Sequence, residues 1–326
     1  MERRKNAIIR GGMALNCSMA YRGCIFGLAI GDALGMPTEF LSLGEIRARF
    51  GPEGVTDLEA GTWPAGHFTD DTQMTLALAE GILAAGVDAP LDAIMSEVAR
   101  SFVAWADDPV GGHRAPGNTC LTGCHNLAAG GPWREAGVAH SKGCGTAMRA
   151  APVGLAWPGD YERIREVGIA QSLATHGHPC ALAGSVAVAA LVSMALERER
   201  PERMLERTVA LTEEISDEFA DYLQRVPEAL KCAPIDAWML LGEAWVAEEA
   251  VAGALYCFLR SPDDYRATVL RAANTDGDSD SLACIAGAIS GAYNGIDAIP
   301  AEWQERIERA DDLLRVAERL CLPTET

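Results

Sequence analysis

Two short stretches of the sequence concentrate carboxylates and hydroxyls in a pattern that can bind metal ions. The first reads Thr69-Asp70-Asp71-Thr72, where a Gly- and Pro-rich stretch meets an apolar periodic segment. The second reads Asp276-Gly277-Asp278-Ser279-Asp280-Ser281 and precedes a Gly- and Ala-rich apolar segment. Their side chains are hard oxygen ligands, which suit Mg²⁺, Mn²⁺ or Ca²⁺.

Taken alone, the first stretch also fits a structural role. Asp is favoured at a helix N-cap and in the first turn, where the helix dipole stabilises negative charge. The second stretch has more aspartates than a cap needs, and their mutual repulsion calls for a nearby cation. An EF-hand is excluded, because its obligatory Gly and Glu positions fall on Ser281 and Gly287.

Together the two stretches predict one dinuclear metal site. Asp70, Asp71, Asp278 and Asp280 would neutralise two divalent ions, and the Thr69 and Ser281 hydroxyls would complete the coordination. Two ions about 3.5–4 Å apart can hold a bridging water and lower its pKa. This hypothesis requires two loops roughly 200 residues apart in the chain to converge.

Helical periodicity dominates the rest of the chain, and the alternation typical of strands is absent. We therefore expect an all-α, single globular domain of about a dozen helices over residues 19–326, after a disordered leader at residues 1–18. The glycines of Met19–Leu34 recur every four residues and offer a smooth face to another helix. The other predicted helices are Asp71–Ala85, Leu91–Ala106, Tyr161–Ala174, Cys180–Leu196, Pro201–Ile215, Asp217–Leu230, Ile235–Trp245, Ala247–Leu259, Asp264–Ala273, Ser279–Tyr293 and Ala301–Leu320. Leu43–Phe68 and Asp107–Gly145 are expected to be long functional loops.

The composition limits the kinds of molecule that this protein is expected to bind. The formal net charge is -19, so we expect no general nucleic-acid binding and no attraction to anionic membranes. No run of about 18 apolar residues predicts a membrane span, and no export signal is recognisable. The ten cysteines are scattered, which is typical of buried thiols in a reducing compartment and predicts a cytoplasmic protein.

The two acidic motifs resemble those of the ADP-ribosylglycohydrolase family, of the type of the dinitrogenase-reductase-activating glycohydrolase. The family's first motif is Thr-Asp-Asp-Thr, and its second is Gly-Asp-Thr-Asp-Thr, against Gly277-Asp278-Ser279-Asp280-Ser281 here. The resemblance implies an all-α fold with two Mg²⁺ or Mn²⁺ ions. The metal ligands it implies are Thr69, Asp70, Asp71, Asp278, Asp280 and Ser281. Serine replaces threonine twice but keeps the hydroxyl, and Asp276 lies outside the pattern.

Three more segments are similar to motifs of this family, and they imply substrate-binding residues. The first runs Gly27 to Gly35 and on to Pro37-Thr38-Glu39-Phe40, and it implies that Glu39 lies near the metals. Gly143 to Arg149 resembles the Gly-x-Gly-x-Ala-Met-Arg segment that approaches the ligand's diphosphate and ribose, and Thr175-His176 resembles a ribose contact. The ligand-binding residues implied are Gly143, Gly145, Thr146, Arg149 and His176. Arg149 is open to a second interpretation, as a structural ion-pair partner.

The function this implies is metal-dependent hydrolysis of a glycosidic bond at the terminal ribose of ADP-ribose. Positive charge would develop on that ribose, and the carboxylates of Glu39, Asp70, Asp71 and Asp280 are the catalytic candidates. We expect a modified protein side chain as substrate, with arginine favoured. A small derivative such as O-acetyl-ADP-ribose or ADP-ribosyl-serine remains an alternative, and so does a non-catalytic ADP-ribose-binding protein.

Overall fold

Helices carry the fold of the computed structural model, which describes residues 2–321, with side chains from residue 18 onward. Within this part the only extended pairings are two isolated bridges, Val138 with His176 and Gly143 with Val246, so the predicted all-α class is confirmed. The α-helices, with the 3₁₀ helices η1 and η2, are α1 (Glu2–Gly35), α2 (Leu43–Phe50), α3 (Asp70–Ala85), α4 (Leu91–Asp107), α5 (Asn118–Ala128), η1 (Cys144–Thr146), α6 (Ala151–Ala156), α7 (Tyr161–Leu173), α8 (Pro179–Leu196), α9 (Pro201–Thr212), α10 (Asp217–Leu223), α11 (Val226–Ala229), α12 (Pro234–Leu241), α13 (Ala247–Arg260), α14 (Tyr265–Ala273), α15 (Ser279–Asn294), η2 (Ile296–Ala298), α16 (Ala301–Arg306) and α17 (Ala310–Cys321).

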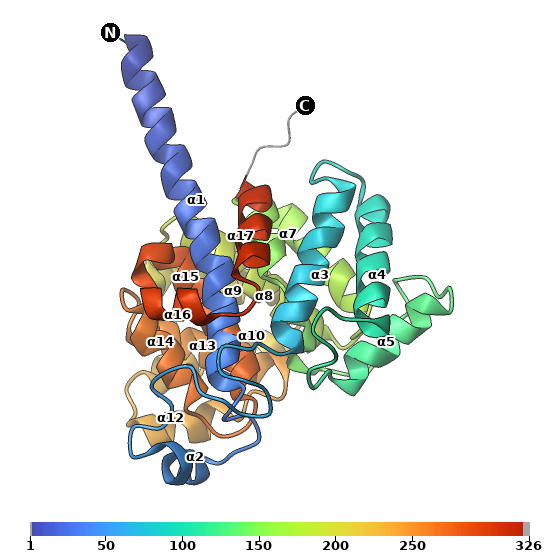
Figure 1. Ribbon diagram of the computed structural model, residues 1–326. Coiled ribbons are helices and arrows are strands. Elements are labelled where there is room, and N and C mark those ends of the chain that lie inside the picture. Colours follow the sequence, from blue (N-terminus) through green and yellow to red (C-terminus); the bar gives the residue numbers. More distant parts are fainter. Residues whose placement is uncertain (1, 322–326) are drawn as a thin grey trace.

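Helix α1 crosses the globule, and its first turns project beyond it (Figure 1). The helix begins at Glu2, well before the predicted Met19. Side chains before residue 18 lie outside the described part of the chain, so the leader at residues 1–18 stays a prediction.

Glycines bring α1 and α15 into backbone contact, as the four-residue spacing predicts. A Cβ at Gly27 would lie 2.4 Å from the Gly287 oxygen, and one at Gly31 would lie 2.1 Å from the Ala283 oxygen. Such separations leave no room for any side chain. One turn further, Gly35 packs on the backbone of Asp280, so this contact sets the start of α15 beside the end of α1.

Replacing Gly31 with Ala is expected to lower the free energy of unfolding by about 3 kcal/mol, because backbone has to move away from the new methyl group. Chemical denaturation followed by circular dichroism measures the change. Gly44→Ala is the matched control, because Gly44 is also helical but a Cβ there would have Ser42 Oγ as its nearest neighbour, at 3.9 Å. The control should be neutral or stabilising by up to about 1 kcal/mol. Equal losses in both variants would contradict this account of the helix contact.

The structure corrects several of the predicted segments. The predicted helix Ile235–Trp245 ends at Leu241. Asp217–Leu230 divides into α10 and α11, and Ala301–Leu320 divides into α16 and α17. The expected loop Leu43–Phe68 contains α2, which a capping box between Ser42 and Glu45 initiates. The expected loop Asp107–Gly145 contains α5.

Helix α8 runs through the core and is almost entirely apolar. By length and composition it is the one helix among the described residues that could cross a membrane, but 83% of it is buried inside the fold. A core helix of a globular domain has the same properties, so this is weak evidence for a membrane span.

Candidate active site

The first acidic motif sits at the N-terminus of α3, where Thr69 is the N-cap and its hydroxyl accepts a hydrogen bond from the Asp71 N–H at 3.4 Å. Asp32, fully buried near the end of α1, holds the motif from the other side. Its carboxylate accepts bonds from the N–H groups of Thr69 at 2.9 Å and Thr72 at 3.0 Å. Asp32 therefore orients the motif through its backbone.

The second acidic motif forms the turn that begins α15. Gly277 has φ +86°, a backbone conformation that glycine adopts without strain, and a Cβ there would meet the Glu243 oxygen at 2.3 Å. The N–H of Asp278 donates to that same oxygen at 2.9 Å, and its side chain caps α15 by accepting from Ser281 N. Asp276 is exposed and accepts a bond from the Leu43 N–H, so it belongs to the turn.

The two motifs converge, as the sequence predicts. A cleft of about 230 Å³ is lined by carboxylates and hydroxyls from both motifs and from the α1–α2 turn, together with the Gly143–Met148 segment: Glu39, Asp70, Asp71, Asp278, Asp280, Ser281, Gly143, Gly145 and His176. Oxygen atoms of Glu39, Asp278 and Asp280 lie within 4.8 Å of one another. Thr69 is fully buried behind this surface.

Crowding of buried carboxylates raises their pKa values. Burial raises the pKa of Glu39 to about 8, and the charges of Asp278 and Asp32 add to the effect. Burial, followed by the charge of Asp32, raises the pKa of Asp71 well above its usual range, and burial, followed by the charge of Glu39, does the same for Asp280. The cleft thus concentrates acidic groups whose ionised forms lack compensating positive charge.

These residues fit a hard divalent cation. Asp71 Oδ2 is buried without a hydrogen-bond partner, a costly arrangement that a bound cation would relieve. The ligand atoms around it are carboxylate and hydroxyl oxygens, which Mg²⁺ and Mn²⁺ prefer. Asp70, Asp71, Asp278, Asp280 and Ser281 line the cleft and could therefore hold the ions. Thr69 is a candidate from its motif alone, because it does not line the cleft and its hydroxyl caps α3.

The segment expected to bind the substrate lines the same cleft. A Cβ at Gly145 would lie 2.8 Å from Cys120 Sγ and 3.1 Å from His176 Cε1, so only glycine fits there without displacing these neighbours. Burial, and then the charge of Arg149, lowers the pKa of His176 to about 3. The His176 ring is therefore neutral near pH 7 and can offer a ligand a hydrogen bond but no charge.

Two predicted ligand-binding residues lie behind the cleft wall. Thr146 is fully buried and donates to the Ala181 oxygen at 2.7 Å. Arg149 is also fully buried, and it donates to Gln171 Oε1 and Thr175 Oγ1, both at 2.7 Å. The Thr175 hydroxyl in turn bonds His176 Nδ1 at 2.8 Å, so Arg149 supports the orientation of His176. Its hydrogen-bond partners are uncharged, unlike the ion-pair partner considered from the sequence.

Several side chains that line the cleft were missed by sequence reasoning, and three of them bear on its chemistry. The Cys144 thiol lies 2.9 Å from Asp278 Oδ2, and its position inside the Gly143–Arg149 motif was the available signal. Phe40 and Trp245 stack at 5.1 Å between ring centroids and remain partly exposed. Trp245 comes from a stretch with no recognisable motif, so only the fold reveals its place.

Comparison with known proteins decides the family. The ADP-ribosylglycohydrolase family matches residues 16–326. The chain belongs to this family. A relative of this chain, ADP-ribosyl-[dinitrogen reductase] glycohydrolase of Rhodospirillum rubrum, is 28% identical over 88% of the chain and 89% of its own length. ADP-ribosylarginine hydrolase Tri1 of Serratia proteamaculans (strain 568) is 25% identical over 92% of the chain and 78% of its own length.

Solved structures agree with this family. One described as an ADP-ribosylglycohydrolase-related protein complex is similar to the chain with a TM-score of 0.73 and 28% identity, over 94% of this chain and 98% of the other. The chain is therefore an ADP-ribosylglycohydrolase, a glycosidic-bond hydrolase, as the two acidic motifs indicated.

Proposed function

We propose that this ADP-ribosylglycohydrolase removes ADP-ribose from a modified protein side chain, arginine in first place, with two Mg²⁺ or Mn²⁺ ions. The observation that carries the proposal is the joint cleft, which carboxylates from three separate segments line together with the Gly143–Gly145 turn and His176. The choice of arginine rests on the Serratia relative, whose name states that linkage. The choice of a protein substrate rests on the Rhodospirillum relative, whose name states a protein target.

Each wall of the cleft has a distinct part in the proposed reaction. The ions, held by the two acidic motifs, would bind ribose hydroxyls and lower the pKa of the attacking water. We assign to Glu39 the role of the base that accepts a proton from the attacking water. Its carboxylate lies within 4.8 Å of those of Asp278 and Asp280, yet Glu39 belongs to neither acidic motif. Neutral His176 would hydrogen-bond a ribose hydroxyl, and the faces of Phe40 and Trp245 can stack on a base.

The leaving group can be tested with three defined substrates: an ADP-ribosyl-arginine peptide, an ADP-ribosyl-serine peptide and O-acetyl-ADP-ribose. Released ADP-ribose is measured by chromatography, with Mn²⁺ and with EDTA. We expect kcat/KM for the arginine peptide to exceed the other two by about 10-fold or more, since a site built for one polar leaving group rejects others. EDTA should abolish turnover, and added Mn²⁺ should restore it.

Each of the other possible results would contradict a different part of the proposal. Faster turnover of the serine peptide or of the acetyl ester would contradict the arginine assignment but keep the hydrolase. Full activity in EDTA would contradict the metal site. Binding of ADP-ribose without any turnover would favour a non-catalytic protein, although all six proposed ligand positions keep a carboxylate or hydroxyl.

A further inference from the structure

A buried ion pair lies behind the first acidic motif and joins three distant segments. Arg114 lies in the loop between α4 and α5, and Glu308 lies between α16 and α17, 194 residues later. Their side chains are only 4% and 13% exposed. The pair is bidentate, with Arg114 Nη1 on Glu308 Oε1 and Nη2 on Oε2, the latter at 2.9 Å. Neither residue lines the cleft.

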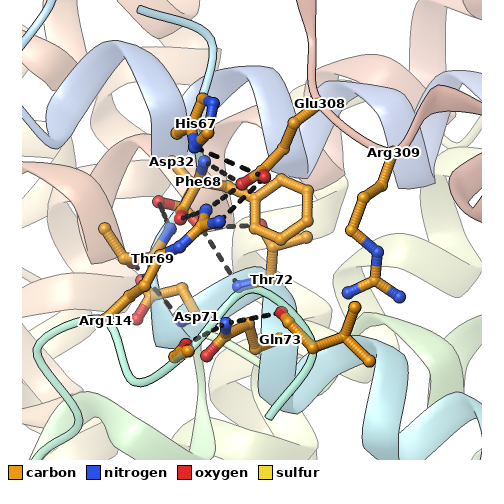
Figure 2. A network of polar contacts seen from close by, with 12 residues as sticks. Asp32, His67, Phe68, Thr69, Asp71, Thr72, Gln73, Arg114, Glu308 and Arg309 are labelled. Atoms are coloured by element: carbon orange, nitrogen blue, oxygen red, sulfur yellow. Dashed lines mark hydrogen bonds and ion pairs between the residues drawn. The ribbon is translucent and has the colours of Figure 1, made fainter. Parts of the chain in front are cut away.

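Both members of the pair also bind the backbone that leads into the metal-binding motif (Figure 2). Arg114 Nη1 donates to the Phe68 oxygen at 2.8 Å, and Glu308 Oε1 accepts from the Phe68 N–H at 3.0 Å. The Arg114 oxygen accepts from the Asp70 N–H at 3.1 Å, and the Glu308 N–H donates to the Gly66 oxygen at 3.0 Å.

These contacts matter because Gly66–Asp70 precedes the helical hydrogen bonding of α3. Three N–H groups of this segment therefore need acceptors from elsewhere. The Phe68 N–H donates to the Glu308 carboxylate, and the Thr69 N–H donates to the Asp32 carboxylate. The Asp70 N–H donates to the Arg114 oxygen. The backbone around Thr69 and Asp70 is thus fixed from two sides by long-range partners. Side chains that fix the orientation of metal ligands commonly control metal affinity.

We propose that the Arg114–Glu308 ion pair positions Thr69, Asp70 and Asp71 for metal binding, and that it sets the affinity of the site for divalent cations. The proposal rests on the metal site of the proposed function. Arginine is required at position 114, because its planar guanidinium reaches both Glu308 oxygens and the Phe68 oxygen at once. A lysine ammonium at this position would lose the bidentate geometry.

The test uses Arg114→Lys in the full chain, freed of metal and titrated with Mn²⁺ without substrate. Free Mn²⁺ is measured by electron paramagnetic resonance, so the readout does not depend on turnover. We expect the dissociation constant for Mn²⁺ to rise about 10-fold. We expect kcat at saturating Mn²⁺ to stay within about 3-fold of the unsubstituted protein, because the metal-binding and cleft side chains are unchanged.

Arg306→Lys is the matched control. Arg306 lies two residues before Glu308 and pairs with Asp57 at 2.7 Å, and the hydrogen bonds of its side chain go to Asp57 and to the Leu58 oxygen rather than to Gly66–Asp70. It should leave the Mn²⁺ dissociation constant unchanged whatever its effect on melting temperature. Glu308→Gln serves as a second variant: it keeps an acceptor for Phe68 N–H but loses the charge pairing, and it should weaken Mn²⁺ binding in the same direction.

The outcomes separate this inference from the metal site itself. Equal Mn²⁺ affinity in Arg114→Lys, Glu308→Gln and the unsubstituted protein would overturn the positioning role and leave the metal site standing. Equal weakening by Arg306→Lys would also overturn it, because any loss of stability would then suffice. Absence of Mn²⁺ binding in the unsubstituted protein would overturn the metal site and the positioning role together.

Discussion

Replacing Asp280 with Asn is expected to lower turnover by about three orders of magnitude and to leave the far-ultraviolet circular dichroism spectrum unchanged. Asp280 lies within 4.8 Å of Glu39 and Asp278, at the point where the proposed ions would sit. The amide removes one negative charge and turns a hydrogen-bond donor toward the cations. The fold should survive, since Asp278 caps α15 and the asparagine side-chain oxygen can still accept from Ser281 N–H.

Asp276→Asn is the matched control for this prediction. Asp276 lies in the same turn, but it is exposed and its carboxylate binds the Leu43 N–H, a contact that an asparagine oxygen can keep. Its turnover should stay close to that of the unsubstituted protein. An Asp280→Asn variant that retained more than about a tenth of the activity at saturating Mn²⁺ would be too active for a lost metal ligand.

Local signals in the sequence were sufficient for most helices and for both acidic motifs. Hydrophobic periodicity marks α3 and α4, a long apolar run marks α8, and the glycine spacing in α1 predicts its close packing on another helix. Periodicity did not predict a helix break where the hydrophobic pattern continues across the break. Between α16 and α17 the chain turns at Arg309, which has φ +52°, and no glycine or proline marks that break.

Long-range partners could not be predicted in the same way. Only the fold shows the carboxylate of Asp32 on the N–H groups of Thr69 and Thr72. Arg114 and Glu308 are ordinary surface-type residues in the sequence, and nothing local pairs them across 194 residues. The residues that could touch the ions are therefore visible in the motifs, whereas those that orient them emerge only from packing.

The buried carboxylates predict opposite pH dependences for metal-free and metal-loaded protein. Folding raises the pKa of Glu39 from 4.5 to about 8 and that of Asp32 from 3.8 to about 6. Between about pH 4 and pH 8 the folded state therefore binds more protons than the unfolded state. By linkage, the contribution of these groups to stability falls as pH rises through this window. Metal binding requires the ionised carboxylates, so its stabilising effect grows with pH.

The prediction is tested by measuring melting temperatures from pH 5.5 to pH 8, with EDTA and with Mn²⁺. At pH 8, Mn²⁺ at about 100 times its dissociation constant adds about 2.7 kcal/mol of stability, which corresponds to roughly 4 °C for a chain of 326 residues. This increment should shrink steadily toward pH 5.5. In EDTA the melting temperature should fall as pH rises.

Asp71→Asn distinguishes the contribution of metal binding to stability from that of the fold itself. Asp71 has the buried oxygen without a partner, so removing its charge should raise the melting temperature in EDTA by about 3 °C and abolish most of the Mn²⁺ increment. Asp276→Asn should change neither quantity, because that carboxylate is exposed. An Asp71→Asn protein less stable than the unsubstituted chain in EDTA would mean that this buried carboxylate stabilises the fold by itself. Buried carboxylates of a metal centre should destabilise the fold when their cations are absent. The opposite result would therefore indicate that the acidic cluster is structural.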